Sequence, residues 1–152
     1  TQRETKEIDL NSMVSEVCTD FAYLVLKQDI HFEFSPAEKP LIVLGTEVLL
    51  KEAIKNILDN ALIHGGPTLS KIAVRCSYDT DMAMVSIWDD GKDLHPDSAA
   101  KIFGRFTQLE PNTGSGLGLA IAHEIAKQSN GTLTVDQIPK GAQITLAIPL
   151  AG

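Results

Sequence analysis

The spacing of apolar side chains divides the chain into helical and extended segments. Over residues 11–28, 46–64 and 116–129 the apolar positions recur every three or four residues, which is the period of an amphipathic helix. The segment 46–64 is the clearest of them, and a Gly-Gly-Pro stop signal follows it at 65–67. We therefore expect three long helices, and a short fourth helix at about 97–103.

The other patterned segments alternate apolar and polar residues or are short and apolar, as β-strands are. The strands predicted in this way are 6–10, 30–34, 41–44, 70–78, 82–89, 132–137 and 142–148. This order of helices and strands favours helices packed on one face of a sheet. The predicted fold class is thus α+β, a two-layer α/β sandwich with a mixed, mainly antiparallel sheet.

The length and composition are those of one ordinary globular domain. The chain has 152 residues, 43% hydrophobic and 22% charged, and no apolar run approaches the ~20 residues of a membrane span. The formal net charge is −7, so we expect no binding to nucleic acid, and a phosphate ligand would need local backbone donors or a metal ion. Cys18 and Cys76 show no CxxC spacing and are expected to be free, buried thiols.

Polar side chains follow one face of the predicted helix 46–64. Glu52, Asn56, Asn60 and His64 recur every four residues, so they share a face that is offset from the apolar stripe. Asparagine is a mediocre helix former, and its side-chain carbonyl is a hard oxygen ligand that suits Mg²⁺ bound together with phosphate and water. Taken alone, the stripe is explained more simply as a solvated helix face.

Two loops also contain residues that folding alone does not explain. Asp89, Asp90 and Gly91 follow the end of a strand, where a carboxylate can accept a hydrogen bond from a ligand amine and glycine allows close backbone approach. The segment 114–118 reads Gly-Ser-Gly-Leu-Gly before a helix, where free N–H groups and the helix dipole can hold phosphate. This segment matches neither a P-loop nor a dinucleotide fingerprint. Each loop alone could be an ordinary turn.

In this order and on these elements, the features resemble the ATP-binding catalytic domain of sensor histidine kinases, in the superfamily shared with gyrase, chaperone and mismatch-repair ATPases. The resemblance covers the chain from Ile8 to Leu150. Its motifs are an N box at 56–61, the start of a first glycine box at 89–91, an F box at 102–106, a second glycine box at 114–121 and a closing strand at 141–150. The second glycine box is the most specific match.

The resemblance implies a Mg-ATP site and assigns roles within it. Asn60 would ligate Mg²⁺ and Asn56 would assist with metal or phosphate, which makes them the implied catalytic residues. Asp89 would accept from the adenine amino group, and Gly91 and His64 would line the adenine pocket. The implied phosphate-binding residues are Arg105, Gly114, Gly116, Leu117 and Gly118. A mobile ATP lid would span 107–113, anchored by Phe103 and Phe106.

The sequence departs from the family pattern at three positions. The first glycine box ordinarily reads Asp-x-Gly-x-Gly, but Asp93 replaces its second glycine, and Ile63 and Gln108 stand where basic residues are frequent. Such changes remove positive charge or backbone freedom, so replacing Asp93 by glycine is expected to tighten ATP binding. The opposite interpretation is that Asp93 makes a useful contact, such as a hydrogen bond that orders the lid or a pairing with Lys92 or Lys101.

The implied function is transfer of the γ-phosphate of ATP to a histidine on a separate dimerisation domain, in two-component signal transduction. No histidine here has the acceptor context, His-Glu/Asp-x-x-x-Pro, because His123 precedes Glu124 but Gln128 stands at the proline position. We therefore expect residues 1–152 to be the catalytic part of a longer protein, with the phosphoacceptor upstream of Thr1. The implied partners are that dimerisation domain, in a full-length homodimer, and a response regulator receiver domain. The resemblance implies a cytoplasmic domain and allows an inner-membrane anchor elsewhere in the full-length protein.

Two other classes of function remain to be compared with this one. A hydrolase of the gyrase or chaperone type uses Glu to activate water at the position of Asn56, and a related serine kinase that regulates sigma factors carries an acid there. Both are disfavoured, because an amide cannot serve as a general base. A degenerate nucleotide-binding or docking module, with weak or no kinase activity, stays open because of the departures from the pattern. Nucleotide titration with and without Mg²⁺ separates it from a kinase.

Overall fold

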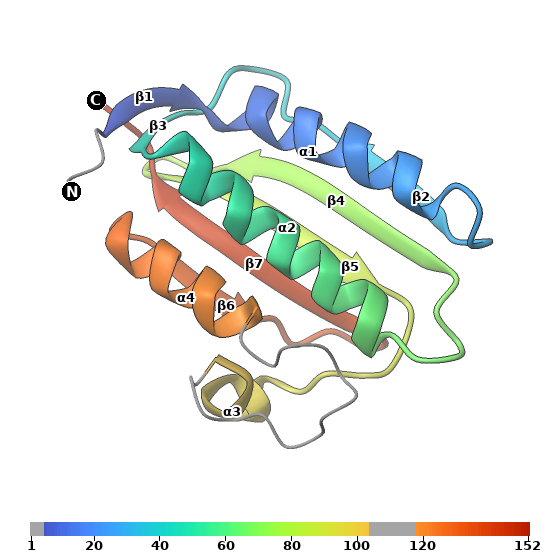
Figure 1. The fold of residues 1–152 in the computed structure, drawn as a ribbon. Coiled ribbons are helices and arrows are strands. Elements are labelled where there is room, and N and C mark those ends of the chain that lie inside the picture. The colour runs from blue at the N-terminus through green and yellow to red at the C-terminus, as the bar shows by residue number, and fades with distance from the viewer. Residues whose placement is uncertain (1–4, 104–117) are drawn as a thin grey trace.

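Helices and a sheet form two layers in the computed structural model, which describes residues 5–103 and 118–152 (Figure 1). The helices are α1 (Leu10–Val25), α2 (Glu47–His64), the short 3-10 helix η1 (Pro96–Ser98), α3 (Ala99–Phe103) and α4 (Gly118–Gln128). The strands are β1 (Lys6–Asp9), β2 (His31–Ser35), β3 (Ile42–Gly45), β4 (Lys71–Tyr78), β5 (Met82–Asp89), β6 (Thr132–Val135) and β7 (Ala142–Pro149). The predicted fold class, α+β with helices on one face of a mixed sheet, is confirmed.

The main sheet has the strand order β2-β4-β5-β7-β6. β2 runs parallel to β4 and the other neighbours are antiparallel, so the sheet is mixed and mainly antiparallel, as predicted. β7, the last strand along the chain, lies between β5 and β6. β1 and β3 form a separate two-stranded sheet, and the amide of Ala151 donates to the carbonyl of Ile42 at 2.8 Å beside it.

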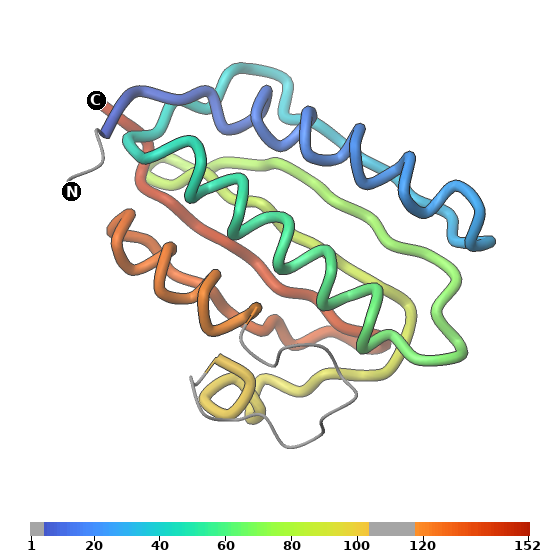
Figure 2. The backbone as a smooth tube through the Cα atoms, in the orientation of Figure 1, coloured from blue at the N-terminus to red at the C-terminus, as the bar shows by residue number. Residues whose placement is uncertain are grey.

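The helices α1, α2 and α4 lie over one face of the main sheet (Figure 2). Along β5 buried and half-buried residues alternate, Val85 and Ile87 being among the buried ones, as expected of a strand with one covered face. On the helix side Leu50 and Leu58 of α2 are fully buried, and each such side chain stabilises the fold by about 1.5–3 kcal/mol. This packing also determines where the polar face of α2 points. None of the described helices has the length and apolarity that a membrane crossing requires.

Several element boundaries differ from the sequence expectation. α1 begins at Leu10 because the carboxylate of Asp9 caps it, accepting a hydrogen bond from the Asn11 amide at 3.0 Å. The same helix ends at Val25, and Leu24, which the apolar spacing placed on its buried stripe, is 67% exposed. The predicted helix 97–103 is divided into η1 and α3, and the predicted strand 132–137 already ends at Val135.

Both cysteines are free and buried, as predicted. Burial raises the pKa of the Cys18 and Cys76 thiols to about 12. Both thiols therefore stay protonated near neutral pH and act as small apolar side chains of the core.

Candidate functional site

The middle of the polar stripe on α2 lies beside the N-terminus of α4. Glu52 and His64 are exposed at its two ends, whereas Asn56 and Asn60 are half-buried between them. Gly118, the first residue of α4, lies against Asn56, since a Cβ atom built on Gly118 would be 3.7 Å from the Asn56 Cβ atom. The middle of the stripe is thus covered, and the simpler explanation of a solvated helix face is wrong for Asn56.

The side-chain amide of Asn56 has an unsatisfied donor. Its Nδ2 atom is buried and has no hydrogen-bond partner among the described residues. A buried donor without a partner costs about 1–3 kcal/mol relative to a paired one. Such an atom is available to a bound group, and an N–H donor is suited to an anionic oxygen.

Asp89 ends β5 as a buried carboxylate. It is 5% exposed and is the one buried polar or charged residue in the described part of the chain. Its Oδ1 atom accepts a hydrogen bond from the Gly91 amide at 2.9 Å. Burial raises the pKa of Asp89 to about 6, against the lowering effect of this hydrogen bond, and the nearby charge of Asp90 adds to the rise. An amine donor from a ligand would stabilise the ionised form of this carboxylate.

Asp90, the next residue, has a different role. Its carboxylate accepts hydrogen bonds from the backbone amides of Ser70 at 2.8 Å and Lys71 at 2.9 Å, and from the hydroxyl of Ser70. These contacts tie the end of β5 to the start of β4. Of the two adjacent carboxylates, Asp90 therefore holds the backbone in place and Asp89 is the one that can serve a ligand.

Gly91 lies against the end of α2. A Cβ atom on Gly91 would be 2.2 Å from the carbonyl oxygen and 2.5 Å from the Cα atom of Gly65, the residue that follows the helix. The Lys92 amide donates to the same Gly65 carbonyl at 2.9 Å. Glycine is required here because the two backbones touch, and this contact places the first glycine box beside the C-terminal turn of the polar helix.

The remaining predicted site residues are only partly within the described chain. Gly118 is described and opens α4, where the first N–H groups of a helix are available to an anion. Arg105, Gly114, Gly116, Leu117 and the predicted lid at 107–113 lie outside the described residues. The structure thus brings together Asn56 with Gly118, and Asp89 with Gly91 at the end of α2.

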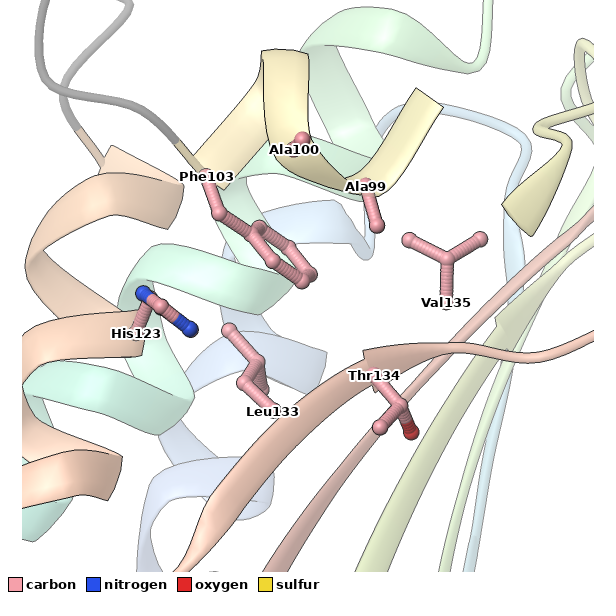
Figure 3. Close-up of a pocket in the computed structure, with 7 residues that line it drawn as sticks. All are labelled: Ala99, Ala100, Phe103, His123, Leu133, Thr134 and Val135. Carbon is pink, nitrogen blue, oxygen red and sulfur yellow. The ribbon is translucent and has the colours of Figure 1, made fainter. Parts of the chain in front are cut away.

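A cavity of about 480 Å³ lies between α3, α4 and β6 (Figure 3). Phe103 of the predicted F box and His123 of α4 face it, with their rings stacked at 5.1 Å between centroids and 16° between planes. Its other lining residues are Ala99, Ala100, Leu133, Thr134 and Val135. Neither Asn56 nor Asp89 lines this cavity, so it is distinct from the polar site.

The closing-strand motif begins at Gly141, but it gave no sign that this residue, in the turn between β6 and β7, lies beside the site. Gly141 is buried with a positive φ of 87°, and a Cβ atom on it would be 2.1 Å from the Asp89 carbonyl oxygen. Its amide donates to the Asp93 carboxylate at 2.7 Å, and its carbonyl accepts from the Leu94 amide at 3.2 Å. A Lys-Gly pair in a turn indicates a bend, but only the folded chain shows what the bend touches.

The chain belongs to the family of histidine kinase-, DNA gyrase B- and HSP90-like ATPases, whose model matches residues 45–152. Within that family its relatives include sensor histidine kinases. It is 29% identical over 151 residues to the sensor histidine kinase CusS of Escherichia coli, covering 96% of this chain and 31% of that protein. The heme sensor protein HssS of Staphylococcus saprophyticus is 32% identical over 152 residues, covering 93% of this chain and 30% of HssS. The chain therefore spans about a third of the length of the curated relatives it matches.

Solved structures agree with this assignment. The catalytic domain of histidine kinase ThkA, in a nucleotide-free form, superposes with a TM-score of 0.86 at 26% identity, covering 97% of this chain and 96% of that one. The mycobacterial sensor histidine kinase MprB superposes with a TM-score of 0.76 at 28% identity, covering 98% of both chains. The resemblance noted from the sequence motifs is thus confirmed, and the domain is of the ATP-binding kind.

Proposed function

We propose that this chain binds Mg-ATP and transfers the γ-phosphate to a histidine on a separate dimerisation domain, in two-component signal transduction. The observation that carries the proposal is the buried, unpaired amide nitrogen of Asn56 beside the N-terminus of α4. A buried, unpaired donor beside a helix N-terminus is suited to bind phosphate oxygens, and in a protein of this family it supports a phosphate-binding site at this point.

The donor set on α2 fits a magnesium ion that arrives with its nucleotide. Asn60 and Asn56 present amide oxygens on one half-buried helix face, and Mg²⁺ ordinarily takes few protein ligands while phosphate and water supply the others. Asn60 would be the ligand, and Asn56 would use its oxygen towards the metal or its nitrogen towards phosphate. When bound, the ion neutralises charge on the phosphates.

The other residues would hold the two ends of the nucleotide. The Asp89 carboxylate would accept a hydrogen bond from the adenine amino group, with Gly91 and His64 at the wall of that pocket. Backbone amides of Gly114, Gly116, Leu117 and Gly118 would hold the phosphates, and Arg105 would add positive charge. Catalysis by this chain is then mostly orientation and charge stabilisation.

In the proposed reaction a ring nitrogen of the acceptor histidine attacks the γ-phosphorus. The bond from that phosphorus to the bridging oxygen breaks, and ADP leaves with that oxygen. Asn56 favours this reaction over hydrolysis, because an amide cannot take a proton from water as a general base. The proposed partners are the phosphoacceptor domain of the same protein, in a homodimer, and a response regulator. In support, the structural neighbour ThkA has been solved in complex with the response regulator TrrA.

The test has a binding step and a transfer step. Calorimetric titration with ATP is expected to show binding that strengthens with Mg²⁺. Labelled ATP is then expected to leave no histidine label on this chain alone, and to give acid-labile, base-stable label on an added dimerisation domain from the same protein. Label on the chain alone would contradict the division into two parts. Absence of nucleotide binding would leave the degenerate docking module as the better interpretation.

A further inference from the structure

We propose that Asp93 is a positioning residue for the adenine pocket: its carboxylate clamps the loop that follows Asp89 and carries Gly91 onto Gly141. This inference rests on the proposed function, because it concerns how the same nucleotide site is held in shape. It also reverses the sequence expectation that an aspartate at this position impairs the site.

The clamp consists of two hydrogen bonds that run in opposite directions. Oδ1 of Asp93 accepts from the Gly141 amide at 2.7 Å, and the Leu94 amide donates to the Gly141 carbonyl at 3.2 Å. Consecutive residues of one loop thus engage both backbone groups of a single buried residue in another. Close by, Nε1 of Trp88 donates to the carbonyl of Lys140 at 3.2 Å, so the turn between β6 and β7 is also fixed to the end of β5.

Gly141 transmits the clamp to the ligand-binding carboxylate. Its backbone packs directly on the peptide that follows Asp89, with the ideal Cβ position only 2.1 Å from the Asp89 carbonyl oxygen and 3.3 Å from the Asp90 Cα atom. The opposite side of the loop is held where Gly91 meets Gly65. Asp89 itself is paired with Ile72 of β4 and Ala142 of β7, so releasing Gly141 would loosen the loop that follows Asp89 on one side and leave it held at Gly65 on the other.

The reasons for expecting Asp93 to impair binding do not apply in this fold. Among the described non-glycine residues only Asp29 and Asn130 have positive φ, so Asp93 has no strained backbone for a glycine to relieve. Its negative charge is directed to an N–H donor of Gly141, and hydrogen bonds to charged groups are the stronger ones. Asp93 therefore supplies, through its side chain, a fixed loop geometry.

The experiment compares side-chain truncation with a variant that keeps the acceptor. Asp93→Ala removes the hydrogen bond, whereas Asp93→Asn keeps a carbonyl oxygen that can accept from Gly141. Calorimetry would measure affinity for ATP and for inorganic tripolyphosphate, both with Mg²⁺, and thermal unfolding would show that each variant is folded. We expect Asp93→Ala to bind ATP about fivefold to tenfold more weakly, with Asp93→Asn within about twofold of the wild type. Tripolyphosphate binding is expected to stay within about twofold in both.

Several outcomes would overturn the proposal. They are unchanged ATP binding by Asp93→Ala, equal weakening of ATP and tripolyphosphate, and failure of Asp93→Asn to restore binding. If Asp93→Ala does not fold, Asp93→Gly is the second truncation variant, and tighter ATP binding by it would overturn the clamp. A wild-type chain that binds no ATP overturns the proposed function together with the clamp. Wild-type binding with an unaffected Asp93→Ala variant overturns the clamp alone.

Discussion

Asn56 of α2 and Gly118 of α4 are neighbours: a Cβ atom built on Gly118 would lie at van der Waals distance, 3.7 Å, from the Asn56 Cβ atom. The two motifs that contain them, the N box and the second glycine box, are far apart in sequence. The packing of α2 against α4 brings them together, so the amide of Asn56 lies beside the first residue of α4. Substitutions on either helix can therefore test the same site.

Asn60→Ala is expected to abolish Mg²⁺-dependent ATP binding while the fold is retained. Asn60 is half-buried on the polar face of α2, and loss of a metal ligand should weaken binding by a few kcal/mol, on the order of a charge-assisted contact. Calorimetry on the folded variant measures this. Glu52→Ala is the matched control, because Glu52 is exposed on the same stripe and should bind Mg-ATP normally. An unchanged affinity in Asn60→Ala would remove this residue from the metal site.

Asp89→Asn is expected to weaken ATP binding more than tripolyphosphate binding. The carboxylate accepts from the adenine amino group in the proposed complex, whereas an amide can present its NH₂ end instead. The loss should be about 1.5–3 kcal/mol, as for a hydrogen bond to a charged group. Titration of both ligands against the variant gives the comparison. Equal weakening of the two would place Asp89 away from the adenine.

ATP affinity is expected to fall as the pH drops below about 6, because burial raises the pKa of Asp89 to about 6 and the ionised carboxylate is the stronger acceptor for the amino group. Calorimetry between about pH 5 and pH 8 would follow the fall, which is at most about tenfold per pH unit below the pKa. The nucleotide's own terminal phosphate titrates in the same range, so Asp89→Asn serves as the control. A variant whose pH profile matches that of the wild type would count against this role.

The same carboxyl makes a prediction about stability without ligand. Its pKa is raised in the folded chain from 3.8 to about 6, so between these values the folded chain holds a proton that the unfolded chain has released. The free energy of unfolding therefore falls as pH rises through this window, by about 3 kcal/mol from this group. Denaturant unfolding of the wild type and Asp89→Asn at pH 4 and pH 7 would reveal it. The difference between the two chains should grow in favour of the variant at the higher pH.

Alanine substitutions at two glycines are expected to differ in their effects on stability and on ATP binding. In Gly91→Ala the new Cβ atom would lie 2.2 Å from the carbonyl oxygen of Gly65, so the variant should lose about 3 kcal/mol of stability. In Gly118→Ala the contact with Asn56 is an ordinary 3.7 Å, and alanine favours a helix by up to about 1 kcal/mol. This variant should fold normally yet bind ATP more weakly, because the methyl group covers the Asn56 amide. Thermal unfolding and calorimetry separate the two effects, and unimpaired ATP binding by Gly118→Ala would argue against phosphate at this contact.

The local sequence pattern was sufficient to predict most helices and strands, but not the contacts that these elements make with one another. The apolar period predicted α2 to within a residue, because its stripe is wide and glycine follows it. The same pattern placed Leu24 in the core, although it is 67% exposed and the next residue, Val25, is only 2% exposed. Periodicity gives the apolar positions but does not show which edge of the apolar stripe is covered. The parallel pairing of β2 with β4 likewise has no local signal.

For the candidate site, motifs located Asn56 and Asp89 because each is surrounded by its own signature residues. The partner of Asp93 could not be found in this way, since Gly141 lies 48 residues further along the chain and the contact exists only after β7 has joined β5. The burial of the Asp89 side chain could not be predicted from the sequence either. A strand-end aspartate can be exposed or buried, and only the packed structure raises its pKa.

The position of β7 in the sheet determines when the domain can form during synthesis. β7 follows the other described strands in sequence and so leaves the ribosome after them, yet it pairs with β5 on one side and β6 on the other. Until it emerges, β5 has an open edge and β6 has no partner in the main sheet. Nascent chains consequently cannot complete the main sheet until β7 is available, and until then the open edge of β5 is exposed to pairing with other chains.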